Sequence, residues 1–293
     1  MPRRPTPLAY AALASVCFFW GTTYLGIRIS IESFPPAVAL SIRYLLSGSI
    51  LLTAALARGA HLPRGRELRV ACLCGILILG IGNGSAFYAE QLIPSGLTSL
   101  FVTISPFWLV GLEALMGGER LHLPSIGGMF VGLAGAVLLL LPSAESSSGP
   151  VLIGFLIIQT GIVSWTLGSI YQRRQPSKAH PIVTGAIQQL AAGIAFVPIA
   201  LASGPFHTEP THRSIFALAY LVVFGTIVGY SSYIFAMDRL PVAIVSIYPY
   251  VNAVVAVFLG WLFFREPVGP REIAAMLIIF AGVAIMKRTA RAR

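Results

Sequence analysis

The sequence predicts an all-α polytopic membrane protein with ten transmembrane helices, arranged as two inverted five-helix repeats with both termini in the cytoplasm. Three observations lead to this fold class: an apolar composition, a series of long uncharged windows and an internal duplication. Hydrophobic residues make up 56% of the 293 positions and charged residues only 10%, whereas a soluble domain has about 25% charged residues. So few charges cannot form a water-facing surface, and most apolar side chains are expected to face lipid or one another.

The first half of the chain contains five candidate spans. Four of them are uncharged windows of at least 20 residues, and the second is apolar apart from Arg43. About 20 apolar residues are enough for a helix to cross the hydrocarbon core of a bilayer. In chain order the five spans are Pro5–Ile27, Pro36–Ala57, Val70–Ala89, Gln91–Leu112 and Leu121–Ala144.

Five further spans follow in the second half. Four are again long uncharged windows, and the last is apolar after its opening Arg271 and Glu272. Together the ten spans leave only short loops and tails, so no separate soluble domain is expected. These spans are Ser146–Gln172, Ala179–Thr208, Ser214–Met237, Leu240–Phe264 and Pro270–Lys287.

The positive charges are distributed unevenly between the two sides of these spans. Four lie on one side, in Arg28, Arg213, Arg265 and Arg271, and fifteen lie in the alternate loops and tails. By the positive-inside rule the richer side is cytoplasmic, which places both termini there and predicts a multi-pass inner-membrane protein. The net charge of +10 is therefore interpreted as an orientation signal, and no nucleic acid is expected as a partner. The fifteen are Arg3, Arg4, Arg58, Arg64, Arg66, Arg69, Arg120, Arg173, Arg174, Lys178, Arg239, Lys287, Arg288, Arg291 and Arg293.

An internal duplication divides the chain into a first repeat over residues 1–145 and a second over residues 146–293. Because five spans is an odd number, the second repeat must lie inverted relative to the first. Inverted repeats are typical of secondary transporters, which bind substrate where the repeats meet. A duplication with a purely structural role is the alternative. Offsets of 145 and then 147 residues align Trp20/Trp165, Arg28/Arg173, Pro36/Pro181, Leu45/Leu190, Gly48/Gly193, Gly82/Gly229, Ser85/Ser232, Pro94/Pro241, Glu119/Glu266 and Gly135/Gly282.

Both halves of the chain carry short motifs of glycine, proline, aromatic and charged residues. They are Phe19-Trp20-Gly21, Arg28, Pro35-Pro36, Ile42-Arg43-Tyr44, Pro94, Pro106, Gly118-Glu119, Gly128 and Gly135, then Pro241, Pro249, Arg265-Glu266-Pro267 and Gly282. With these motifs the chain resembles the EamA-type members of the drug/metabolite transporter superfamily over nearly its whole length, and within it bacterial exporters of aromatic and other neutral amino acids. Gln188 departs from the pattern, because it stands where the counterpart of Arg43 is expected.

Two interior prolines and three polar side chains are candidates for the transport machinery. Pro106 and Pro249 each remove a backbone donor from a span, and interrupted helices at corresponding places in two repeats point to a transporter's site. Ordinary helix kinks are the alternative. Asn83, Ser105 and Asn252 are polar groups within spans that could bind the ammonium and carboxylate groups of a zwitterion, or else connect helices. Close helix contacts for gating are expected at Gly82 and Gly229.

Aromatic side chains are the third group of candidates. Trp and Tyr are enriched at membrane interfaces, so some of them are expected to be anchors there. Trp20 and Trp165 are different, because both lie in mid-span and align in the repeat. An aromatic cavity would suit apolar or aromatic substrates. The predicted substrate-binding aromatics are Trp20, Tyr24, Phe87, Tyr88, Trp108, Trp165, Tyr230 and Tyr248.

Charged residues within or near spans need an explanation, because a charge in hydrocarbon is costly. Arg43 is predicted to extend towards the interface or to bind a carbonyl, Glu90 to lie at the exit of its span, and Glu113 to approach a cytoplasmic end. Arg28 and Glu32 are predicted to form a local ion pair. No acidic pair is evident deep in a span, and protons are kept open as a coupled ion.

The sequence also argues against other classes of protein. All five histidines lie in loops or at span ends, so no intramembrane metal site is predicted. No phosphate-binding loop is present, and no cofactor or enzymatic activity is expected. The resulting hypothesis is a secondary transporter that exports small neutral, largely apolar metabolites, most notably amino acids including aromatic ones, by alternating access. A multidrug or other metabolite permease of the same superfamily is the alternative; a channel or an intramembrane enzyme is an alternative of another class.

Overall fold

The computed structural model describes residues 6–93, 95–117, 123–140, 148–177, 179–203, 209–255 and 269–291, in which the regular structure is all helical. Several predicted features lie outside these residues: the end of the span Leu240–Phe264 and the motif positions Pro94, Gly118-Glu119 and Arg265-Glu266-Pro267. The helices of the first half are α1 (Pro7–Ser30), α2 (Pro36–Leu56), α3 (Arg66–Gly75), η1 (Ile76–Asn83), α4 (Gly84–Ala89), α5 (Ser95–Val102), α6 (Ser105–Leu115) and α7 (Leu123–Leu140).

The second half follows the same plan. Its helices are α8 (Ser148–Arg174), α9 (Pro181–Ala202), α10 (His212–Tyr220), η3 (Leu221–Val228), α11 (Gly229–Arg239), α12 (Val242–Val245), a helical stretch over 248–255, and α14 (Pro270–Arg291). Within the described residues, seven helical segments are long and apolar enough to cross a membrane, and two shorter apolar helices occupy Leu123–Leu138 and Ile273–Met286. The polytopic, all-helical class predicted from the sequence is thereby confirmed.

Two spans that the sequence predicts as plain α-helices contain π-helical segments. In the third span η1 continues α3 and leads into α4, and in the eighth span η3 continues α10 and leads into α11. Each π-segment is eight residues long, and the two lie 145 residues apart. A π-helix inserts extra backbone into a turn and is frequent at functional sites. Neither segment is identified by the hydrophobic pattern of its span.

The fourth and ninth spans are interrupted near their prolines. α5 ends at Val102 and α6 begins at Ser105, so Pro106 lies in the first turn of the second helix, where its missing N–H costs little. α12 ends at Val245, and helical backbone resumes at 248, one residue before Pro249. The predicted span Gln91–Leu112 is therefore two shorter helices rather than one kinked helix.

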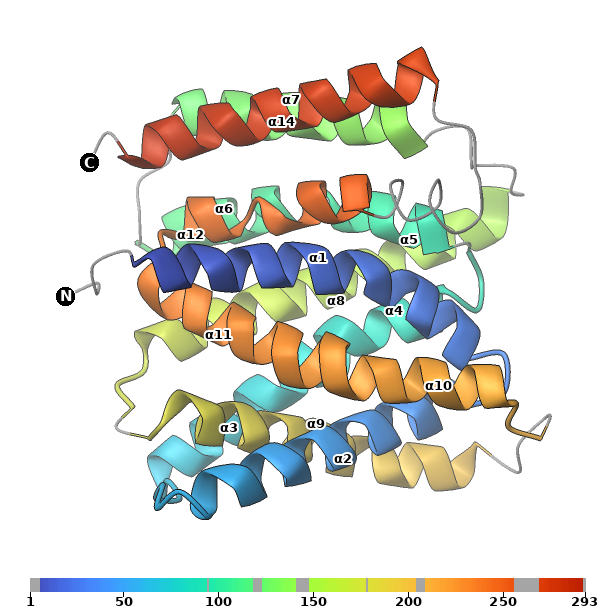
Figure 1. Cartoon of the computed structure of the whole chain (residues 1–293), viewed down its shortest axis with the longest axis vertical. Coiled ribbons are helices and arrows are strands. Elements are labelled where there is room, and N and C mark those ends of the chain that lie inside the picture. The colour runs from blue at the N-terminus through green and yellow to red at the C-terminus, as the bar shows by residue number, and fades with distance from the viewer. Residues whose placement is uncertain are drawn as a thin grey trace.

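Corresponding helices of the two halves pack against each other. α2 packs on α9 and α7 on α14, while α1 packs on α10, η3 and α11, and α8 packs on α3, η1 and α4. Figure 1 shows the α2–α9 pair at one end of the molecule, the α7–α14 pair at the other, and α1 and α8 between them. Helices that are aligned by the offsets of 145 and 147 residues therefore either contact each other or contact corresponding helices of the opposite half.

The α2–α9 contact is reciprocal. A Cβ atom on Gly48 would lie 2.8 Å from Leu190 Cγ, and one on Gly193 would lie 2.9 Å from Leu45 Cγ. Since Gly48 aligns with Gly193 and Leu45 with Leu190, each helix presents the same pair of residues to the other. Leu45 of α2 lies beside Gly193 of α9, and Gly48 lies beside Leu190, so the two helices are antiparallel. Small residues permit this close approach of two helices within a membrane.

Candidate functional site

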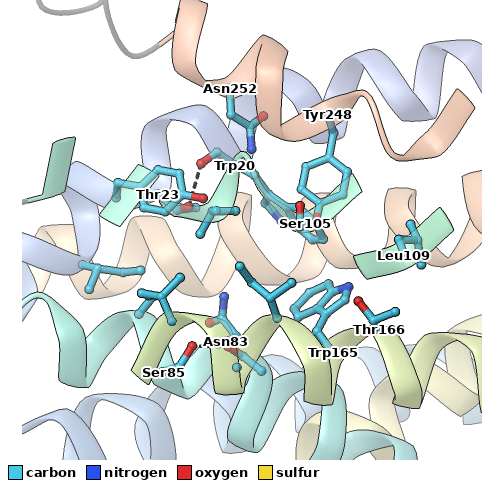
Figure 2. Close-up of a pocket in the computed structure, with 18 of the residues that line it drawn as sticks. Trp20, Thr23, Asn83, Ser85, Ser105, Leu109, Trp165, Thr166, Tyr248 and Asn252 are labelled. Atoms are coloured by element: carbon cyan, nitrogen blue, oxygen red, sulfur yellow. Dashed lines mark hydrogen bonds between the residues drawn. The ribbon is translucent and has the colours of Figure 1, made fainter. Parts of the chain in front are cut away.

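A cavity lies at the centre of the molecule, where segments of both halves meet. The space between its lining atoms, with the open mouth included, is about 810 Å³. Figure 2 shows Asn83 and Trp165 extending into it from one side, and Tyr248 and Asn252 from the other. It is lined by Trp20, Thr23, Tyr24, Ile27, Arg43, Gly82, Asn83, Ser85, Ala86, Val102, Ser105, Leu109, Ile158, Gly161, Ile162, Trp165, Thr166, Ser246, Tyr248 and Asn252.

An aromatic cluster forms one wall of the cavity. Trp20 meets Trp165 edge to face with ring centroids 5.3 Å apart, and Tyr248 edge to face at 5.1 Å. Behind them, Tyr233 lies 5.2 Å from the Trp20 ring and 5.3 Å from the Trp165 ring. Such arrangements stabilise aromatic groups by roughly 0.5–1.5 kcal/mol per pair beyond burial of their surface. The cluster joins the first half to the second.

Hydrogen bonds hold both indole rings in place. Trp20 Nε1 donates to the Gly225 carbonyl of η3 at 3.0 Å, and Trp165 Nε1 donates to the Tyr233 hydroxyl at 3.0 Å. The glycines predicted for close contact lie directly beneath these rings. A Cβ atom on Gly229 would be 2.5 Å from Trp20 Nε1, and one on Gly82 would be 3.0 Å from Trp165 Cβ. Each half thus supplies a tryptophan that packs on a glycine of the other half.

Neutral polar groups lie at two ends of the cavity. Asn83 Oδ1 accepts hydrogen bonds from Tyr44 Oη at 2.8 Å and Arg43 Nη1 at 3.0 Å. With its amide nitrogen facing the neighbouring carbonyls, Asn252 donates hydrogen bonds to the backbone carbonyls of Tyr248 at 2.9 Å and Cys17 at 2.8 Å. Because the oxygen of Asn83 is occupied, its amide nitrogen is left as a donor. Because the nitrogen of Asn252 is occupied, its oxygen is left as an acceptor.

The structure brings together seven of the predicted substrate-binding residues, which are Trp20, Tyr24, Asn83, Ser105, Trp165, Tyr248 and Asn252. Gly82 also lines the cavity, and Gly229 supports Trp20. Of the two prolines, Pro106 is buried one residue after the cavity-lining Ser105, and Pro249 is buried one residue after Tyr248.

Four predicted residues do not line the cavity. Trp108 is 38% exposed and donates to Gln159 Oε1 at 2.9 Å on the outer side of α6. Phe87 is fully buried beneath the Arg43 guanidinium, with Tyr88 on an adjacent face of α4. Tyr230 is buried behind the aromatic wall and donates to Gln188 Oε1 at 2.7 Å. Their residue type suggests a role in binding, but the helix face they occupy points elsewhere.

Arg43 lines the cavity, which the sequence does not predict. It is only 3% exposed and does not extend to the interface, and its hydrogen-bond partners are side chains rather than a backbone carbonyl. Nε donates to Thr226 Oγ1 in η3 at 2.6 Å, and Nη1 donates to Asn83 at the end of η1. The signal in the sequence is the charge itself, since a buried cation in an apolar span requires polar partners. Thr226, 183 residues away, has no local signal that identifies it as one of them.

Two carboxylates occupy contrasting surroundings. Glu113 forms a salt bridge with Arg174, with Oε1 and Nη2 3.5 Å apart. Glu90 lies just beyond the span Arg66–Ala89 and is fully buried, and neither of its carboxylate oxygens has a hydrogen-bond partner among the described residues. Arg28 donates instead to the Glu90 backbone carbonyl. Burial raises the pKa of the Glu90 carboxyl well above its ordinary value, while the positive charge of Arg28 acts in the opposite direction.

Comparison with known proteins finds relatives along the whole chain. The EamA-like transporter family matches residues 7–141 and again residues 152–288. The "Uncharacterized inner membrane transporter YedA" of Escherichia coli (strain K12) is 35% identical over 286 residues, covering 97% of this chain and 92% of that protein. The "Uncharacterized transporter YvbV" of Bacillus subtilis (strain 168) is 26% identical, covering 100% of this chain and 96% of that protein.

A more distant relative and a solved structure agree with these matches. Protein PecM of Dickeya dadantii (strain 3937) is 22% identical over 271 residues, covering 92% of this chain and 88% of that protein. A solved structure titled "Crystal structure of protein" superposes with a TM-score of 0.81, covering 97% of this chain and 98% of that chain. At 23% identity this superposition shows a shared fold.

Proposed function

The chain belongs to the EamA-like transporter family, and we propose that it exports small neutral, largely apolar metabolites, most notably amino acids including aromatic ones, by alternating access. It is a multi-pass transporter of the inner membrane. The observation that carries the proposed substrate class is the aromatic wall formed by Trp20, Trp165 and Tyr248, with amide and hydroxyl groups at the ends of the same cavity. Aromatic rings bury apolar side chains, and a few fixed polar groups orient them.

The proposed architecture is two inverted repeats, residues 1–145 and 146–293, which together cross the membrane ten times. The antiparallel, reciprocal contacts of Gly48 with Leu190 and of Gly193 with Leu45 support it, because a two-fold axis in the membrane plane would produce them. In Figure 1, α1 begins and α14 ends on the same side of the helices, as an even number of crossings requires. The two family matches also divide the chain in the same region.

Alternating access would use the irregular segments around the cavity. The π-helices η1 and η3 and the interruptions before Pro106 and Pro249 place weakened backbone hydrogen bonding next to the site. Gly82 and Gly229 let the Trp165 and Trp20 side chains of the opposing half pack directly against their backbone. We therefore assign these four residues to hinges and gating, so that the cavity opens to one side of the membrane at a time.

The test of this proposal is counterflow in proteoliposomes. Vesicles containing the purified protein are preloaded with unlabelled phenylalanine, leucine or alanine, and uptake of labelled phenylalanine is followed. We expect saturable uptake that exceeds uptake into empty vesicles, with phenylalanine the strongest of the three, because its ring suits the aromatic wall. Absence of counterflow with every amino acid, together with counterflow of a cationic drug, would favour the multidrug alternative.

Glu90 is the proposed site of proton coupling. It continues the helix one turn beyond Ala86, which lines the cavity. Arg28, on α1, supplies the positive charge that acts on it. A buried carboxyl without a partner can exchange a proton as its exposure changes between the two states of a transporter.

Glu90→Gln is expected to abolish the acceleration of transport by a pH gradient while leaving counterflow, which needs no net proton movement, within about threefold of wild type. Transport is measured with and without the gradient in the same vesicles. Glu32→Gln is the matched control, since Glu32 is an exposed carboxylate at the same end of α1, and it should respond as wild type does. A wild-type protein insensitive to the gradient, or a Glu90→Gln variant that responds normally, would refute coupling at this residue.

A further inference from the structure

Arg43 is the only charged side chain among the described residues that line the cavity. Both halves hold it in place, through Thr226 in η3 and Asn83 in η1. Its guanidinium also lies over the Tyr44 ring at 5.3 Å and the Phe87 ring at 5.7 Å. Gly225 makes room for it, because a Cβ atom there would lie 3.2 Å from Arg43 Nη2. The position of the guanidinium is therefore fixed by contacts on several sides.

The partners of Arg43 orient its charge without neutralising it. Thr226, Asn83 and the two rings are all neutral, and no salt bridge to Arg43 is found within the described residues. A guanidinium has five N–H donors, and these two hydrogen bonds use two of them. A cation removed from water without a counter-charge is strongly destabilising, so a fixed, buried and uncompensated arginine in a cavity wall is suited to bind an anion.

The second half of the molecule argues against a purely structural role for the charge. Gln188 aligns with Arg43, and Tyr230 aligns with Asn83. These two residues also form a hydrogen bond, of 2.7 Å, between α9 and α11. The same junction between helices is therefore made by neutral groups in one half and by a cation in the other. The packing of the fold does not require a charge at this position, and the positive charge is present on one side only.

We propose that Arg43, supported by Asn83, forms a subsite for the carboxylate of the transported molecule, whose apolar part lies against Trp20 and Trp165. This inference rests on the proposed function and specifies its substrate class as monocarboxylates, including zwitterionic amino acids. The planar fork of the guanidinium matches a carboxylate, with two parallel N–H···O hydrogen bonds. With one cation in the wall, the cavity can balance one negative charge, which disfavours dianionic phosphate esters.

The experiment measures binding to purified protein through quenching of tryptophan fluorescence, with two probes of equal shape: 3-phenylpropanoate and its neutral amide. We expect wild type to bind the carboxylate at least about tenfold more tightly than the amide, as charge-assisted bidentate hydrogen bonds provide. Arg43→Gln should bind the two probes equally while retaining its affinity for the amide. Arg213→Gln, which removes an exposed arginine from α10, should keep the wild-type preference.

Several outcomes would overturn the subsite. Equal binding of the two probes by wild type does so without any variant, and so does an Arg43→Gln protein that keeps the preference. If Arg43→Gln fails to fold, Arg43→Lys retains the charge, and its preference should fall without vanishing. A preference lost in Arg43→Gln, in a protein that shows no amino-acid counterflow, would leave the subsite standing and the amino-acid assignment wrong. Counterflow with no carboxylate preference would instead refute the subsite and leave the amino-acid assignment standing.

Discussion

Replacing Trp20 by alanine is expected to lower kcat/KM for counterflow by about tenfold or more. Trp20 contacts Trp165, Tyr233 and Tyr248 through its ring. Each aromatic pair contributes roughly 0.5–1.5 kcal/mol, and about 1.4 kcal/mol of lost transition-state stabilisation is a tenfold change in rate. The substitution removes part of the substrate-facing wall and also the hydrogen bond to the Gly225 carbonyl, so it weakens both binding and the connection between the two halves.

Two further variants separate these effects from a loss of folding. Phe18→Ala is the matched control, because Phe18 lies on the same helix, is 47% exposed and does not line the cavity. Trp20→Phe keeps an aromatic ring in the wall but cannot donate to the Gly225 carbonyl. We expect Phe18→Ala to transport within about twofold of wild type, and Trp20→Phe to lie between the two alanine variants. A Trp20→Ala protein that elutes as wild type and transports normally would exclude Trp20 from the site.

The comparison of Trp20, Trp165 and Trp108 shows what the sequence can and cannot predict about the site. Trp20 and Trp165 are distinguished by their shared place in the repeat, and the structure puts them together in the cavity wall. Trp108 is suggested by residue type alone, and it faces outward. In a soluble helix the polar face would indicate its direction, but a membrane helix can be apolar on all sides. Only the contacts between helices then determine which face lines a cavity.

Long-range side-chain partners and irregular backbone segments are the second kind of feature that the sequence does not predict. The charge of Arg43 is evident from its own span. Its partners Thr226 and the Phe87 ring come from distant segments, so the sequence around Arg43 does not identify them. The π-helices η1 and η3 carry no composition that distinguishes them from an α-helix. Thr226 does show the altered geometry, since its hydroxyl donates to the Leu221 carbonyl five residues earlier. Span positions and the repeat follow from local pattern, whereas the register of opposing helices depends on packing.

Gly75→Ala is expected to lower the free energy of unfolding by about 2–3 kcal/mol, the upper part of the range of roughly 1–3 kcal/mol for overpacked sites. A Cβ atom on Gly75 would lie 2.3 Å from the Gln188 carbonyl oxygen and 2.6 Å from Gln188 Cα. Both atoms belong to the backbone of α9, so no side-chain rotation relieves the clash, and α3 must move away from α9. In a protein of this size the melting temperature should fall by about 3–5 °C, measured by loss of the monodisperse peak after heating.

Gly80→Ala is the control for this prediction. It lies in the same span, and the nearest heavy atom to its added Cβ would be 3.8 Å away, an ordinary contact. An equal loss of stability in both variants would mean that glycine is needed for the backbone of η1 rather than for the contact with α9. A stable Gly75→Ala protein would mean that α3 can separate from α9 at little cost. In that case the contact with Gly75 would not fix the position of Gln188. The hydrogen bond from Tyr230 would then still position the Gln188 side chain, which is the counterpart of Arg43 in the second half.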